Sequence, residues 1–239
     1  MPGGGASGPA SVGVSSRWSD LRLRVASAAV LLPVALGCLY YGGVAWFALV
    51  LAATLALLWE WWRLWRLKPG AIPALTLLAG WSYMVLGAGS LYWLRSDPAA
   101  GLINVLFLLV VVWSSDIGAY TAGRLIGGPK LAPAISPGKT WSGAVGGLVC
   151  AMIIGLLVSR AVAAGPTSHA LIFGAGLSVA SQLGDLLESA LKRHFGVKDS
   201  SRLIPGHGGV FDRLDGVLAA GPVAMLLAAI VGPGVELWR

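Results

Sequence analysis

The chain is 239 residues long, carries a formal net charge of +7, and is 56% hydrophobic with a mean hydropathy of +0.79. This composition excludes an ordinary soluble domain, and apolar runs of about 18 residues or more recur along the chain. The basic residues flank apolar runs and form no soluble face interleaved with aromatic side chains, which excludes nucleic acid as a partner. Cys38 and Cys150 lie inside apolar runs, so we expect neither a disulfide framework nor a cysteine metal site.

The apolar runs predict an all-α fold, a polytopic integral membrane helical bundle of about seven transmembrane helices. Residues 1–16 are rich in Gly, Ser and Pro without apolar periodicity, and we expect this N-terminal tail to be disordered. Residues 17–239 are expected to form a single transmembrane catalytic domain, because the spans and their loops use the whole length. The expected spans are residues 25–41, 44–62, 72–94, 102–123, 141–162, 169–190 and 214–231.

The second expected span contains an acid, Glu60, close to its end. Arg63 follows it by three residues, which places the two side chains on one helical face. An ion pair at the surface is the prediction for this acid.

Basic residues are distributed unevenly between the two ends of the predicted spans. If the N-terminus is cytoplasmic, all but three of the 17 Lys and Arg residues fall on cytoplasmic segments, and the exceptions are Arg95, Arg160 and Arg239. The positive-inside rule therefore predicts a multi-pass protein of the cell inner (plasma) membrane. Its N-terminus and the loops at residues 124–140 and 191–213 are expected in the cytoplasm, where these loops form the active site.

Two acids inside the expected spans, Asp116 and Asp185, need partners or a function, since an ionised Asp there costs about 3 kcal/mol. Each lies about 10 to 12 Å below the basic residues at the end of its span. Asp185, Glu188 and Lys192 share one helical face, and Asp116 shares a face with Tyr120 on another helix. Such polar stripes must face each other or a wet cavity. Internal salt bridges that only pack the helices are the alternative.

Charge is concentrated near the C-terminus, where residues 185–215 hold ten of the 27 charged side chains around a Gly-His-Gly-Gly turn. This mixture suits an anion bridged by a metal ion. Mg²⁺ takes oxygen ligands, usually one or two carboxylates plus substrate phosphates and water, and Asp185 and Asp212 fit that role. A first-turn acid that stabilises a helix N-terminus is the alternative for Asp212.

Residues 189–215, with the sequence SALKRHFGVKDSSRLIPGHGGVFDRLD, resemble the fingerprint of the phosphatidate cytidylyltransferases, or CDP-diacylglycerol synthases. The resemblance implies transfer of a cytidylyl group from CTP to phosphatidic acid, which yields CDP-diacylglycerol and pyrophosphate in phospholipid biosynthesis. CTP, phosphatidic acid and membrane lipid are the implied partners, and a homodimer is a further expectation for the oligomeric state. The alternatives are another lipid-phosphate or polyprenyl nucleotidyl or phosphoryl transferase, and a transporter for an anionic solute.

A second block, residues 115–147, contains Gly138-Lys139-Thr140. A nucleotide-binding P-loop is excluded, because Pro133 stands where that motif needs Gly and we expect no strand before it. The block resembles the SPxKT-W-x-G segment of the same family. This resemblance implies that Ser136, Lys139 and Thr140 lie at the start of a helix and hold phosphate oxygens. Many family members carry Glu two residues after the Thr, where this chain has Ser142.

The family resemblance and the residue chemistry together assign the site. The resemblance implies that Asp185 and Asp212 hold Mg²⁺, with Asp215 as a further ligand and with one or two metal ions. The expected catalytic residues are Asp185, Asp212, Lys192 and Arg193. The expected substrate-binding residues are Asp116, Ser136, Lys139, Thr140, Lys198, His207, Gly208, Gly209 and Arg213.

Overall fold

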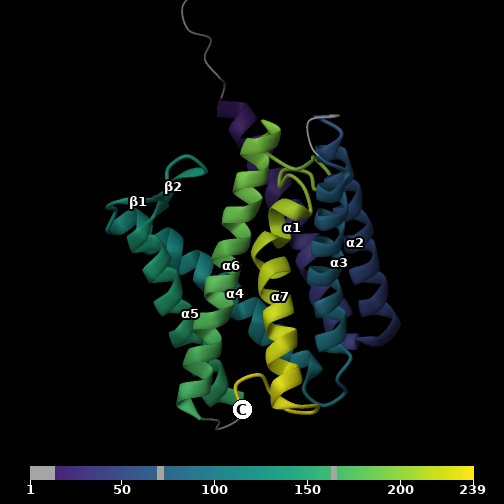
Figure 1. Cartoon of the computed structure of the whole chain (residues 1–239), viewed down its shortest axis with the longest axis vertical. Helices are drawn as coiled ribbons and strands as arrows, with labels where there is room; N and C mark the ends of the chain where they lie inside the picture. The colour runs from purple at the N-terminus through teal and green to yellow at the C-terminus, as the bar shows by residue number, and fades with distance from the viewer. Residues whose placement is uncertain (1–13, 69–72, 163–165) are drawn as a thin grey trace, which may run out of the picture.

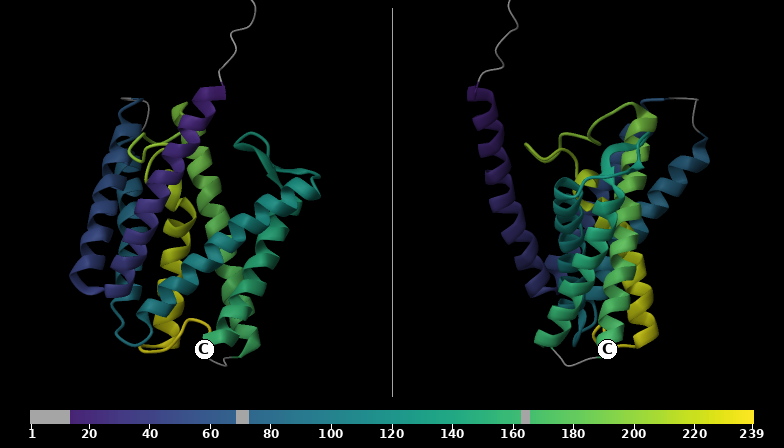
Figure 2. Two further views of the ribbon diagram at one scale, coloured as in Figure 1. Left: turned by 180° about the vertical axis from the view of Figure 1, so that it is seen from behind. Right: turned by 90° about the vertical axis from the view of Figure 1, so that its left-hand side faces the viewer.

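The computed structural model describes residues 14–68, 73–162 and 166–239. Within these ranges, seven helices have the length and composition to cross a membrane. Most of them run up and down along the long axis of the molecule (Figure 1), whereas the helix of residues 101–125 crosses the bundle obliquely (Figure 2). The predicted polytopic helical bundle is thereby confirmed, and the fold is that of a multi-pass membrane protein.

The first three helices are α1 (Val14–Tyr41), α2 (Gly43–Trp65) and α3 (Ala74–Arg95). Residues 1–13 of the expected disordered tail lie outside the described residues, whereas Val14–Ser16 already belong to α1. Helix α1 leans away from the other helices over much of its length (Figure 2). One tie to the bundle is the guanidinium of Arg95, whose Nε donates to the carbonyl oxygen of Leu39 at 2.7 Å.

The prediction for Glu60 on α2 is wrong. Its side chain is fully buried and accepts hydrogen bonds from residues 200–211, while Arg63 donates to the carbonyl oxygen of Ser200 at 2.8 Å. The spacing between Glu60 and Arg63 could not reveal this, because the partners of both lie more than a hundred positions away.

Helices α4 (Gly101–Leu125) and α5 (Trp141–Val162) pack closely through small residues. A methyl group added to Gly147 would lie 2.7 Å from the carbonyl oxygen of Ser115, so the two backbones nearly touch. Between these helices, β1 (Lys130–Ala132) and β2 (Ser136–Thr140) form an antiparallel hairpin. The expectation that no strand precedes Gly138 is therefore wrong. Ser136 and Lys139 lie in β2 and not at the start of a helix, as predicted, whereas Thr140 stands directly before the start of α5.

The last two helices are α6 (Thr167–Phe195) and α7 (Phe211–Val231), and both extend further toward their connecting loop than predicted. Helix α6 ends at Gly196, whose φ of 71° gives the left-handed cap that glycine favours. The connecting loop is thus residues 196–210, shorter than the expected 191–213. Lys192 and Arg193 consequently stand in the last turn of α6, and Asp212 stands in the first turn of α7.

The loop at residues 196–210 and the β1–β2 hairpin lie at the same end of the bundle, which we call the loop end (Figure 1). The C-terminus lies at the opposite end (Figures 1 and 2). Fully buried side chains from α2, α4, α6 and α7 form the core between the ends, among them Trp61, Phe107, Leu177 and Leu218. This packed core leaves the polar chemistry to the loop end.

Candidate active site

A cavity of about 660 Å³ opens at the loop end between α4, α5, α6, α7 and the hairpin. Its walls combine carboxylates, amide and hydroxyl groups, and basic side chains. The predicted site residues that line it are Asp116, Lys139, Thr140, Asp185, Asp212, Arg213 and Asp215. The two sequence blocks that resemble the family, residues 115–147 and 189–215, therefore both contribute to the walls of one cavity.

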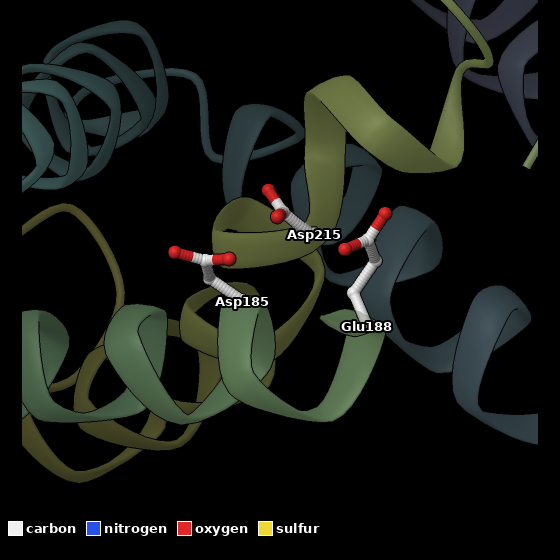
Figure 3. A group of neighbouring side chains, drawn as sticks. All are labelled: Asp185, Glu188 and Asp215. Carbon is white, nitrogen blue, oxygen red and sulfur yellow. The ribbon is translucent and has the colours of Figure 1, made fainter. Parts of the chain in front are cut away.

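Three carboxylates gather beside this cavity, and two of them, Asp185 and Asp215, line it. Asp185 and Glu188 come from α6 and Asp215 from α7, and one ligand atom from each lies within 4.8 Å of the others. Figure 3 shows the three side chains converging from the two helices. Three acids this close repel one another unless cations lie beside them, and carboxylate oxygens are the ligands that Mg²⁺ prefers. The donor set fits a divalent cation.

Two lysines neutralise part of this charge. Lys139 Nζ lies 2.6 Å from Asp185 Oδ2 and joins strand β2 to α6. Lys192 Nζ lies 2.5 Å from Glu188 Oε1 and 3.1 Å from Asp212 Oδ1. Lys192 thus links Glu188, one of the three grouped acids, to the neighbouring acid Asp212.

Asp212 lines the cavity, but its carboxylate faces the loop at residues 196–210. Its Oδ2 accepts hydrogen bonds from the amides of Gly209 at 2.8 Å and Ser200 at 2.9 Å, and from Ser200 Oγ at 3.1 Å. The group of acids close enough to share a metal ion is Asp185, Glu188 and Asp215, and Asp212 is not a member of it. Asp212 is therefore in position to order the loop, with a metal-binding role resting on the family resemblance.

The remaining predicted residues lie around the cavity, not in its walls, in the described part of the chain. Arg193 Nε donates to the carbonyl oxygen of Ile135 at 3.3 Å and ties α6 to the hairpin. His207 Nδ1 lies 2.9 Å from Ser27 Oγ on α1. The other predicted residues outside the walls are Ser136 in β2, Lys192 in α6, and Lys198, Gly208 and Gly209 in the loop.

Thr140 ends strand β2 and caps helix α5. Its Oγ1 accepts a hydrogen bond from the amide of Gly143 at 3.1 Å, which satisfies one of the free N–H groups at a helix start. Ser142, which stands where many family members carry Glu, donates to the carbonyl oxygen of Gly127. Ser142 thus holds the two ends of the hairpin segment together.

Sequence reasoning did not assign several residues that the structure brings to the site. Helical periodicity places Glu188 on the same face as Asp185, and its proximity to Asp215 follows only from the structure. Tyr120 and Arg124 follow Asp116 at intervals of four residues, so this polar face extends over about two turns of α4. Both residues line the cavity, and Arg124 donates to the Tyr120 hydroxyl at 3.0 Å. For these three the helical period of polar side chains was the available signal.

The sequence matches the model of the cytidylyltransferase family over residues 78–231. A phosphatidate cytidylyltransferase of Brucella suis biovar 1 (strain 1330) is 39% identical, over 89% of this chain and 94% of its own length. Proteins of the same name from Staphylococcus saprophyticus and Haemophilus influenzae are 47% and 41% identical over 61% and 63% of this chain, and over 55% and 56% of their own lengths. Both the matched region and the full-length similarity include the cavity, and the chain belongs to the cytidylyltransferase family.

Proposed function

We infer that this chain transfers the cytidylyl group of CTP to phosphatidic acid and releases pyrophosphate. The observation that carries this inference is the cavity in which Lys139 of one family block meets Asp185 and Asp215 beside the other. Family membership and the names of the full-length relatives support the same reaction. CTP and phosphatidic acid are accordingly its substrates.

In this reaction a phosphate oxygen of phosphatidic acid attacks the α-phosphorus of CTP. The bond between the α-phosphorus and the oxygen that bridges to the β-phosphorus breaks, and pyrophosphate leaves with that oxygen. Phosphoryl-type transfer asks little covalent work of a protein, so positioning and charge neutralisation carry the catalysis. The cavity's basic side chains, Lys139, Arg124 and Arg213, supply positive charge for two substrates that otherwise repel.

Mg²⁺ is the cofactor that this donor set suits. Asp185, Glu188 and Asp215 would hold it, with Asp212 on the adjoining wall. When bound, the ion neutralises charge on the triphosphate and polarises the phosphorus that is attacked. Lys139 and Lys192 pair with Asp185 and Glu188 and offset part of the repulsion between these carboxylates.

The loop end is proposed to face the cytoplasm of a cell whose inner membrane the protein spans. Basic residues belong to the elements of the loop end: Lys130 and Lys139 to the hairpin, Lys192 to the last turn of α6, and Lys198 to the loop that follows it. Arg160 belongs to the last turn of α5, and Arg239 is the C-terminal residue, at the opposite end of the bundle (Figure 1). The positive-inside rule favours this orientation. A lipid phosphate at the headgroup level can then enter the cavity from the membrane side while CTP enters from water. The homodimer stays a prediction.

The test is an assay of the purified protein in detergent with CTP labelled in the α-phosphate. Phosphatidic acid and Mg²⁺ together should give labelled CDP-diacylglycerol and one equivalent of pyrophosphate. Replacement of phosphatidic acid by a polyprenyl phosphate or a polyprenol separates the alternative transferases. Turnover with a polyprenyl substrate and none with phosphatidic acid would overturn the proposed function.

A further inference from the structure

Glu60 on α2 is a buried carboxylate whose partners all come from one distant segment. It accepts hydrogen bonds from Ser201 Oγ at 2.5 Å, Ser200 Oγ at 3.2 Å, and the amides of Val210 at 2.9 Å and Phe211 at 2.8 Å. Its exposed fraction is 0%. A buried carboxylate is tolerated only when its oxygens are hydrogen-bonded, and four donors meet that condition here.

Two of these donors are backbone amides at the start of α7. The first N–H groups of a helix have no partner within the helix, and the residue before α7 supplies no side-chain cap. Glu60 supplies the cap from another helix, and its negative charge faces the positive end of the α7 dipole. A side chain of α2 therefore caps the first turn of α7.

Ser200 links Glu60 to Asp212. Its amide donates to Asp212 Oδ2 at 2.9 Å, and its hydroxyl lies 3.2 Å from Glu60 Oε2 and 3.1 Å from Asp212 Oδ2. The single hydroxyl proton can serve one carboxylate at a time, so the two acids share this donor. A displacement of Glu60 would therefore be felt at Asp212.

Gly209 completes the connection. Its amide donates to Asp212 Oδ2 at 2.8 Å, and a side chain at this position would clash with Ser200 Oγ and Glu60 Oε1. At Gly209 the loop backbone, Ser200 and Glu60 thus pack against one another without space for even a methyl group. Because these groups are close-packed, a shift of the Glu60 side chain would shift the loop backbone with it.

We propose that Glu60 is a positioning residue for cytidylyl transfer: it holds residues 200–211 in place and through Ser200 and Gly209 sets the Asp212 carboxylate at the cavity wall. The proposal rests on the proposed function. It gives a role in the reaction to α2, which lies outside the matched residues 78–231. Arg63 of the same helix adds a second hold on the loop through the carbonyl oxygen of Ser200.

The principal variant is Glu60→Gln, which keeps the shape of the side chain and replaces one acceptor oxygen by an amide that cannot accept. Ser201→Ala is a milder second variant that removes one donor and leaves the carboxylate with three. Thr54→Val is the matched control, because the Thr54 hydroxyl on the same helix donates only to the carbonyl oxygen of Val50 within α2. Three quantities are measured: kcat and KM for each substrate, thermal unfolding, and hydrogen–deuterium exchange of peptides that cover residues 200–211.

For Glu60→Gln we expect kcat to fall about tenfold to a hundredfold, because a small misplacement of a reacting group costs that much. Amide exchange across residues 200–211 should accelerate, and exchange in α4 and α5 should stay as in the original protein. Ser201→Ala should show both effects to a smaller extent, and Thr54→Val should show neither.

Activity of Glu60→Gln within about twofold of the original protein would overturn the proposal, since positioning should cost more than that. The proposal would also be overturned if Glu60→Gln lost activity while amide exchange of residues 200–211 stayed unchanged, or if Thr54→Val lost as much activity as Glu60→Gln. If Glu60→Gln does not fold, Ser201→Ala decides by the same two readouts. A failure of the proposed function has a different signature, namely an original protein without CTP:phosphatidate turnover whose exchange at residues 200–211 still responds to Glu60→Gln.

Discussion

Lys139 Nζ lies 2.6 Å from Asp185 Oδ2, so strand β2 and helix α6 are joined by an ion pair at the wall of the cavity. The side chains on both partners are partly exposed, at 26% for Lys139 and 37% for Asp185. An exposed ion pair contributes little to stability. The pair is thus available to rearrange when phosphates and a cation enter the cavity.

Lys139→Ala should lower kcat/KM for CTP about a hundredfold, because it removes a charge that would neutralise the phosphates. Stability should change little. The measurement is steady-state kinetics at varied CTP, together with thermal unfolding. Lys130→Ala is the control, since Lys130 is an exposed lysine on the paired strand β1 and does not line the described cavity. Equal losses in the two variants would show that only the general positive charge of the hairpin matters.

Asp215→Asn removes one charge from the group formed with Asp185 and Glu188. The Mg²⁺ concentration that gives half-maximal activity should rise about tenfold or more, since loss of a metal-binding group weakens affinity by at least that much. A titration of activity against Mg²⁺, and of ion binding by calorimetry without substrates, measures the change. Glu236→Gln serves as control, because its carboxylate pairs with Arg239 near the C-terminus. An unaltered Mg²⁺ dependence would remove Asp215 from the ligand set.

Asp212→Asn should reduce CTP turnover about a hundredfold or more while the protein stays inserted and folded. The remaining carbonyl oxygen can still accept from the amides of Ser200 and Gly209, so the loop keeps part of its support. The ion pair with Lys192 is lost. The check is turnover of labelled CTP in parallel with thermal unfolding. Asp199→Asn is the control, because Asp199 is an exposed acid of the same loop. Near-normal activity of Asp212→Asn would show that Asp212 is not a catalytic residue.

Asp97 between α3 and α4 should affect stability and leave the reaction unchanged. Its carboxylate accepts hydrogen bonds from the amides of Ala100 and Ala99, and from that of Gly234 near the C-terminus. These bonds, the one from Ala100 first, lower the pKa of Asp97 below its ordinary value of 3.8. A lowered pKa in the folded state means that the stabilisation is present above the ordinary pKa and is lost as pH falls through the folded one.

Asp97→Ala is therefore expected to lower the free energy of unfolding by about 1 kcal/mol at neutral pH. The difference from the original protein should shrink only under strongly acidic conditions. Thermal unfolding at several pH values measures it, and kcat at neutral pH should be unchanged because Asp97 lies outside the cavity walls. A loss of kcat larger than the loss of folded protein would contradict this expectation.

Much of the architecture could be predicted from local pattern. Seven apolar runs predicted seven spans, since a helix of about 20 apolar residues matches the hydrocarbon thickness and each run satisfies its own backbone hydrogen bonds. The polar stripe that starts at Asp185 also predicted that Glu188 and Lys192 share its face. The ends of α6 and α7 were missed by several residues, because apolar pattern does not record how far a helix continues beyond the membrane.

The amino-acid sequence by itself determined the number of spans and indicated Asp185, Asp212 and Lys139 as candidate site residues. Only the tertiary structure decided which side chains meet: Glu188 with Asp215, Lys139 with Asp185, and Glu60 with the start of α7. Helical periodicity relates side chains within about two turns, whereas each of these contacts joins separate elements. Which side chains meet depends on how whole helices pack. For Glu60, this packing gives buried hydrogen bonds to the start of α7 in place of the surface ion pair that the nearby Arg63 suggests.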